Sequence, residues 1–325
     1  MGAASLSLAA LGVADSWGDT HLQVVVKLQV MVAIAGGIIA AFTGLLNPIV
    51  GRMNAFFFIQ STSTISVDGG AFYFFTDDIA SFPLGPHFSV WFYTTGIGLV
   101  SSICGLVGLY AYAQFMSTWR YRSVFLFSNF SWCVVSLASI LVFTRHNLQL
   151  GIPDFAFVVG GTVLQTVFER WTYVPGGVLL SQVCPEGMEA TMFALLAGCQ
   201  NLGRGVASFF GSFMLAYLDV NPNGTAGDET QFKNLWLAAA FQALAPLVTL
   251  WMIPALIPDK MQNERVLEDE PGAATRGSPW SRLQASWSVW RGLPLSDVGS
   301  TGATYGATDR HQSDRATGSC STGGS

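Results

Sequence analysis

Charged side chains are scarce in this sequence. Asp, Glu, Lys and Arg make up 11% of the 325 residues and hydrophobic residues 51%, whereas a soluble domain carries about 25% charged residues. A soluble chain of this length would form about two domains, but the charge-free runs are too long for soluble cores. The net charge of −5 and the lack of a basic cluster argue against nucleic acid as a partner. The composition predicts a multi-pass membrane protein in contact with lipid.

The sequence also lacks the patterns that mark enzymes and metal sites. Its five cysteines have no paired spacing and its four histidines are scattered, so neither a disulfide framework nor a metal site is expected. The motifs G-x-S-x-G, H-E-x-x-H and the P-loop are all missing. We therefore predict that the protein is not an enzyme and needs no cofactor.

Long charge-poor runs define the domain organisation. Residues 1–27 contain an apolar stretch too short to span a membrane, which suggests a remnant of a lost helix or an N-terminal segment. Residues 28–258 form a predicted transmembrane bundle, and residues 259–325 are rich in Gly, Ser, Thr and charge, which predicts a disordered tail. The seven candidate spans are 28–51, 53–76, 88–119, 123–144, 155–185, the helix that follows to 218, and 234–258.

The loop charges predict the orientation. Alternation places Arg52, Arg120 and Arg122 on one side, with Asp77 and Asp78 on the other. Because cytoplasmic loops are enriched in Lys and Arg, the first side and the C-terminal tail are expected in the cytoplasm. The sequon at Asn223 then lies outside, in a loop whose shortness argues against glycosylation. The segment 279–293 can form a short amphipathic helix at the membrane surface, but a transient stretch without a function is the favoured interpretation.

The stretch 184–203, CPEGMEATMFALLAGCQNLG, begins a long membrane helix. Pro185 suits a first helical turn. Further along, Gly203, Ala207 and Gly211 recur every fourth residue, a small-residue seam that lets two membrane helices approach closely. An arginine within such a helix, Arg204, is expected to face protein or a watery cavity.

This stretch resembles the signature of the folate–biopterin transporters, a branch of the major facilitator superfamily, and most of all their protist type. The resemblance extends over about residues 46–260. It implies an all-α fold of twelve spans in two six-helix halves, of which this chain resembles the C-terminal half plus one preceding span. Four further motifs agree in order and spacing: AFYFFTDD (71–78), FPLGPHFS (82–89), RHNLQLGIPD (145–154) and AGDETQFKNLW (226–236).

Ionisable residues within spans are candidate functional residues. Asp68 shares a helix face with Gln60 and Thr64 and precedes Gly69 and Gly70, where we expect the helix to break, as at the substrate sites of many transporters. The resemblance also implies an Asp after a similar polar run. The alternative is that Asp68 lies near the outer end of its helix and is merely solvated.

Two more charges lie in the span 155–185. Glu169 shares a polar stripe with Thr162, Gln165, Thr166 and Tyr173, although the resemblance implies an uncharged, Gln-like residue near this position. Arg170 points about 100° away from Glu169, so the two cannot pair face to face. Binding substrate and pairing with a carboxylate on another helix are equally open for Arg170.

Arg204 lies one turn from Gln200 and beside Asn201. A guanidinium flanked by amides suits a ligand carboxylate, which it can bind bidentately. An interhelical ion pair is an equally good interpretation. Most Trp and Phe residues are expected to face lipid, with Trp171 and Tyr173 as candidates for stacking on a ring.

The leading functional hypothesis is a carrier for folate, biopterin or a related pteridine. Asp68 or Glu169 would accept the amino and imino protons of the ring, and Arg204 or Arg170 would hold the anionic tail. A protonatable carboxylate in the cavity would permit proton coupling. The alternatives are a carrier of another small metabolite, such as an amino acid or S-adenosylmethionine, and a truncated half that transports nothing alone. In the second case, we expect a requirement for a second six-span half or a homo-oligomer.

Overall fold

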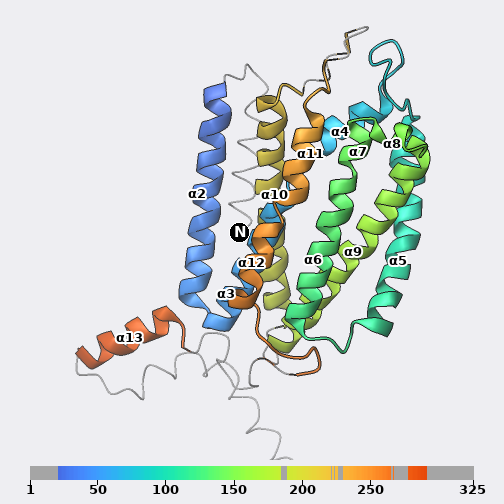
Figure 1. Ribbon diagram of the computed structural model, residues 1–325. Coiled ribbons are helices and arrows are strands. Elements are labelled where there is room, and N and C mark those ends of the chain that lie inside the picture. The colour runs from blue at the N-terminus through green and yellow to red at the C-terminus, as the bar shows by residue number, and fades with distance from the viewer. Residues whose placement is uncertain are drawn as a thin grey trace, which may run out of the picture.

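The computed structural model shows a bundle of long helices that run side by side (Figure 1). It describes residues 21–183, 189–220, 222, 224–225, 230–264, 266 and 277–290. Predictions that concern residues 1–20, Pro185 or Asn223 lie outside the described residues. The described part of the chain contains no strand, only one isolated β-bridge between Arg120 and Met261.

All seven predicted spans are largely helical. The elements are α2 (His21–Leu45), α3 (Pro48–Ser63), α4 (Asp68–Thr76), the π-helical turn η1 (Phe92–Gly96), α5 (Ile97–Phe115), α6 (Tyr121–Ala138), α7 (Ile140–Phe143), α8 (His146–Gln149), α9 (Asp154–Val183), α10 (Glu189–Tyr217), α11 (Leu235–Leu244), α12 (Leu247–Leu256) and α13 (Pro279–Trp290). The described part of the chain is therefore all-α, as the family resemblance implies.

Three helical stretches in the described residues are long and apolar enough to cross a membrane on length and composition alone: Phe92–Phe115, Tyr121–Phe143 and Leu235–Leu256. The span made by α3 and α4 is interrupted, while α9 and α10 are long but carry polar side chains in their middle turns. This mixture is typical of a bundle in which some helices face lipid and others line a polar interior. That all seven cross the bilayer in the major facilitator arrangement stays a prediction.

The central core joins helices that are distant in sequence. Phe56 and Phe57 of α3 meet Phe125 of α6 edge to face, with ring centroids 5.3 and 6.1 Å from Phe125. Leu179 of α9 and Ile253 of α12 are fully buried in the same cluster. Edge-to-face rings add roughly 0.5–1.5 kcal/mol per pair beyond the area they bury. This core holds α3, α6, α9 and α12 together.

The second predicted span breaks earlier than the sequence suggests. We expected the break at Gly69 and Gly70, but α3 ends at Ser63 and α4 begins at Asp68, so residues 64–67 are the unwound segment. Gly70 lies inside α4, and a Cβ there would come within 3.1 Å of the side chains of Leu215 and Leu235. Its missing side chain provides room for packing, and the expected position of the break was wrong.

The predicted small-residue seam of α10 makes this unwound segment possible. A Cβ at Gly203 would lie 2.8 Å from the carbonyl oxygen of Phe58 in α3. One at Gly211 would collide with the Ser66 carbonyl group, whose carbon is 2.8 Å from that position. Ala207 between them is buried. The seam therefore brings the backbone of α10 against both α3 and residues 64–67, as close helix packing through small residues requires.

Replacing Gly211 with alanine is expected to destabilise the protein and displace the unwound segment, because a methyl group cannot fit against rigid backbone. The loss should be about 1–3 kcal/mol, seen as a lower midpoint of thermal unfolding in detergent. Gly205 is the matched control, since a Cβ there meets nothing within 4 Å. A Gly211→Ala variant as stable as Gly205→Ala would contradict the packing argument.

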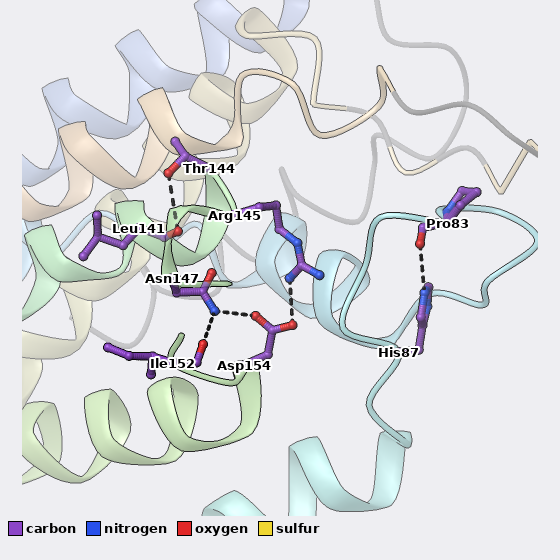
Figure 2. A network of polar contacts seen from close by, with 8 residues as sticks. All are labelled: Pro83, His87, Leu141, Thr144, Arg145, Asn147, Ile152 and Asp154. Atoms are coloured by element: carbon purple, nitrogen blue, oxygen red, sulfur yellow. Dashed lines mark hydrogen bonds and ion pairs between the residues drawn. The ribbon is translucent and has the colours of Figure 1, made fainter. Parts of the chain in front are cut away.

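The described residues of the four further motifs, 71–78, 82–89, 145–154 and 230–236, lie largely at one end of the bundle (Figure 1). Phe82 packs against Phe232 with centroids 4.8 Å apart, and Gln231 donates a hydrogen bond to the carbonyl of Ser81. Figure 2 shows Asp154, at the start of α9, between Arg145 and Asn147. The ion pair from Arg145 measures 2.9 Å and is mostly shielded from solvent. Phe74 of α4 links the loops, because it contacts both Phe232 and Arg145. We call the described residues of loops 77–89, 144–153 and 218–234 the cap.

The cap also contains the acidic end of α4. Burial of Asp77 raises the pKa of its carboxyl group above the ordinary value, as does the neighbouring Asp78, while His87 lowers it. His87 has a positive φ of 53°, and its Nδ1 lies 2.8 Å from the backbone oxygen of Asp77. The loop after α4 is thus folded back onto the helix end.

At the opposite end, the chain that follows α12 is attached to the loop between α5 and α6. Gln262 is buried and donates hydrogen bonds to the carbonyls of Met116 and Trp119 at 2.7 and 3.1 Å. Arg120 pairs with Asp259 at 3.1 Å. The expected disordered tail from residue 259 therefore begins with a segment that is hydrogen-bonded to the bundle. Residues 279–290 of the same tail form helix α13.

Candidate functional site

A polar cavity lies between the middle turns of the long helices. It has a volume of about 360 Å³, within the range of roughly 300–1,000 Å³ for small-molecule sites. Helices α3, α6, α9, α10 and α11 and the start of α4 contribute to it. Its polar lining consists of Gln60, Ser61, Thr64, Asp68, Thr162, Gln165, Thr166, Glu169, Thr172, Gln200, Arg204 and Gln242.

Asp68 lies where this cavity meets two neighbouring ones. It lines all three cavities because it is the first residue of α4, immediately after the unwound segment. The hydroxyl of Ser66 donates to its carboxylate at 2.8 Å. A carboxylate at a helix N-terminus is also stabilised by the helix dipole. The geometry holds a negative charge at a fixed point where the helix is broken.

The rest of the polar face of α3 also lines the cavity. Gln60 donates a hydrogen bond of 3.3 Å to Asn129 of α6, which leaves its amide oxygen available on the cavity side. Thr64 uses its hydroxyl to donate to the Ser61 carbonyl at 2.7 Å. The three residues predicted to share this face, Gln60, Thr64 and Asp68, are brought together in one site.

Helix α9 separates its two charges. Glu169 lines the cavity with the threonines and glutamine of its stripe and with Tyr173. Arg170 does not line it: its guanidinium lies against Gly105 of α5, with Nε 3.2 Å from the position of a Cβ there. Trp171 is also turned away and donates from its indole nitrogen to the Gly108 carbonyl at 2.9 Å. Of the two predicted stacking residues, only Tyr173 lies at the cavity.

Arg204 enters the cavity from α10. Its guanidinium donates a hydrogen bond to the side-chain oxygen of Asn201 at 3.1 Å, and Gln200 lines the cavity beside it. Asn201 itself does not line the cavity, so its role is to orient Arg204. Within the described residues Arg204 has no ion-pair partner within 4 Å. The interhelical ion pair considered for Arg204 is therefore not formed there.

Two residues of the site were missed by sequence reasoning. Gln242 of α11 lines all three cavities, and Trp132 of α6 lines two of them. Gln242 is the only amide side chain of α11 (Leu235–Leu244), a signal that a search restricted to charged residues overlooks. Trp132 carries no signal that distinguishes it from the lipid-facing tryptophans.

A second compartment of about 360 Å³ adjoins the first on the cap side. It shares Asp68, Thr162, Gln165 and Gln242 with the first cavity. Its remaining lining is largely apolar and aromatic and includes Phe75, Tyr93, Phe143 and Phe157. A polar compartment and an aromatic compartment thus meet at one carboxylate.

The charges around the polar cavity are exposed and unpaired. Asp68, Glu169 and Arg204 are all solvent-exposed, and in the part of the chain that the structure describes none of them forms an ion pair. Charges within a membrane bundle are costly unless they face water, protein or a ligand. The arrangement can bind a molecule with hydrogen-bond donors at one end and an acidic group at the other. It defines a multi-pass membrane protein with a solute-sized polar cavity between its helices.

Comparison with known proteins then identifies the family. A family model described as the BT1 family matches residues 13–275, so the chain belongs to the BT1 family. It is 32% identical over 219 residues to a folate-biopterin transporter of Synechocystis, which covers 66% of this chain and 40% of that protein. It is 29% identical over 221 residues to the probable folate-biopterin transporter 2 of Arabidopsis thaliana, covering 68% of this chain and 42% of that protein.

A more distant relative is the folate transporter 1 of Plasmodium falciparum, 25% identical over 158 residues, or 49% of this chain and 30% of that protein. The chain thus spans less than half the length of these relatives. No solved structure matches the chain. The predicted resemblance to the folate–biopterin transporter family is confirmed, and the relatives named here are transporters rather than enzymes.

Proposed function

We propose that this chain forms part of the pathway by which a carrier moves folate or a related pterin across a membrane. The observation that carries the proposal is the mid-bundle cavity with its unpaired Asp68, Glu169 and Arg204. The names of the BT1 relatives supply the class of substrate. Broken helices around a midplane site are a recurring design in secondary transporters.

The two compartments suggest separate roles for the two ends of folate. The pterin ring is flat and carries amino and imino donors, which suit the Asp68 carboxylate beside the aromatic lining of the second compartment. The glutamate tail carries carboxylates, which suit the planar guanidinium of Arg204. Glu169 and Gln242 complete the polar lining between them.

Coupling to a proton gradient is the finer part of the proposal. Asp68 and Glu169 are the two carboxyl groups that line the first cavity, and both are exposed there. Closure around a substrate would remove water, and desolvation favours the neutral, protonated form of a carboxylate. Uptake would then depend on protons entering with the substrate.

The exposure of the polar face argues for a covering surface. Gln60 is half-buried, and Thr64, Asp68, Glu169 and Arg204 are exposed, an unfavourable surface to present to lipid. We propose that a second six-helix half, or a second copy of the chain, covers this face during transport. Rocking of one half against the other would open the cavity to alternate sides.

Two measurements on the full chain test the function. The first is equilibrium binding of labelled folate to the chain in lipid nanodiscs. We expect saturable binding, and unlabelled biopterin should displace the labelled folate. The second is uptake into proteoliposomes, by the chain alone and after co-expression with the N-terminal half of the Synechocystis relative. We expect uptake only with the covering half.

The substrate class would be contradicted if folate bound neither to the chain alone nor to the chain co-expressed with the covering half. Binding of an amino acid or S-adenosylmethionine in place of folate would favour the alternative carrier. Robust uptake by the chain as a monomer would contradict the need for a covering half.

A further inference from the structure

Helix α13 belongs neither to the matched family region nor to the cavity. It spans 12 residues, Pro279–Trp290, and the family match ends at residue 275. It contacts α2, and Figure 1 shows it crosswise to the long helices and pointing away from the bundle, near the end where α2 leads into α3. The role of α13 therefore has to be argued from its own side chains.

One side of α13 is apolar and exposed. Trp280, Leu283 and Trp287 are 52, 61 and 64% exposed. Their spacing of three and four residues places them in one stripe, because each residue of an α-helix advances by about 100°. Ser281 lies on the opposite side, about 160° from Leu283 around the helix axis. An exposed stripe with two tryptophans is unfavourable in water.

The charge of this segment has one sign. Arg282 is the only charged residue of α13, and Arg276 and Arg291 flank it. No Asp or Glu occurs from residue 271 to residue 295, although acidic residues occur on both sides of that range. A short basic segment with a tryptophan-rich face is typical of helices that lie in the interface of an anionic membrane.

The start of the helix is buried and capped. Ser278 is almost fully buried, with 1% of its surface exposed. Its hydroxyl oxygen accepts a hydrogen bond of 3.1 Å from the backbone nitrogen of Ser281, and Pro279 occupies the first helical position, which suits proline. Neighbouring α2 exposes Val32 and Leu45, side chains suited to lipid. The bilayer is thus the apolar phase that adjoins α13.

We propose that α13 is a membrane-surface helix. It lies in the headgroup region beside the α3 end of α2, with Trp280, Leu283 and Trp287 inserted among the acyl chains and Arg282 close to anionic headgroups. Tryptophan rings are favoured at this depth because they are amphipathic. The helix thereby fixes the start of the C-terminal tail at one face of the membrane.

The test places an environment-sensitive fluorophore on the full-length chain, with the native cysteines replaced by alanine. Leu283→Cys is labelled in the stripe and Ser281→Cys opposite to it, and both are reconstituted in vesicles of phosphatidylcholine and phosphatidylserine. We expect blue-shifted emission only from the label at position 283. Quenching by lipids spin-labelled near the headgroup should be at least about twofold stronger there than at position 281.

Thermal unfolding of both labelled variants, compared with the parent, confirms that the bundle is folded in the samples compared. Equal, water-like emission at both positions would overturn the proposal. The label at position 283 could instead show blue-shifted emission that lipids do not quench and that increases with protein density in the vesicles. That result would overturn the proposal in favour of a contact between copies of the chain. If the label at position 283 were quenched equally with and without phosphatidylserine, the role of Arg282 would be overturned and only apolar insertion would remain.

Discussion

An Asp68→Asn variant is expected to bind folate about 10- to 100-fold more weakly, because a hydrogen bond to a charged group contributes about 1.5–3 kcal/mol. The substitution keeps the size of the side chain and removes its charge. Asp68 lines all three cavities, so no other carboxylate of the described site is placed to replace it at this junction. The measurement is equilibrium binding in lipid nanodiscs.

The pattern across ligands makes this prediction specific. If Asp68 accepts donors of the pterin ring, binding of biopterin, which lacks the glutamate tail, should weaken as much as binding of folate. Asp259→Asn is the matched control, since Asp259 pairs with Arg120 at the end of the bundle, away from the cavity. Parent-like affinity of the Asp68→Asn variant for both ligands would mean that Asp68 is merely solvated and does not bind the substrate.

The proton-coupling proposal gives the same variant a second readout. In a transport-competent assembly, uptake by the parent protein is expected to rise when the outside pH is lowered. A variant that cannot take up a proton at position 68 should lose part of that dependence if Asp68 is the coupling group. Unchanged pH dependence would assign coupling to Glu169 or to a residue of the covering half.

The sequence was most informative where a single residue type has few physical solutions. The seam of Gly203, Ala207 and Gly211 predicted a close helix approach, and the structure has it between α10 and α3. The polar faces of α3 and α9 likewise predicted most of the cavity lining. Small residues and intramembrane charges are diagnostic because lipid offers them so few alternatives.

The sequence was least informative where neighbours decide the outcome. Gly69 and Gly70 predicted a break that occurs instead at residues 64–67, since the room for the break comes from Gly211 on another helix. Nor did the sequence reveal that Arg170 faces α5 while Glu169 faces the cavity. Helical periodicity gives the angle between two side chains but not which helix each one meets.

The segment after α12 shows the same limit. Its composition predicts disorder, which describes an average over many residues. Gln262 nevertheless donates hydrogen bonds to the carbonyls of Met116 and Trp119, because the loop between α5 and α6 presents both carbonyls at that end. A single well-placed amide can order a segment whose composition is otherwise that of a flexible chain.

An Arg204→Lys variant is expected to discriminate between ligands in a way that Asp68→Asn does not. Lysine keeps the charge but loses the planar pair of donors that matches a carboxylate. Affinity for folate should fall about tenfold, since a bidentate, charge-assisted contact is replaced by a single one. Affinity for biopterin should stay near the parent value because it has no carboxylate for Arg204 to bind.

The neighbouring helix provides the matched control for this substitution. Arg170→Lys makes the same chemical change in a guanidinium that lies against Gly105 and does not line the cavity. Folate affinity in that variant should remain near the parent value, while the packing of α9 on α5 weakens slightly. Equal losses of folate affinity in the two variants would mean that lysine disturbs the bundle in general. Parent-like folate affinity in Arg204→Lys would remove Arg204 from the binding site for the tail.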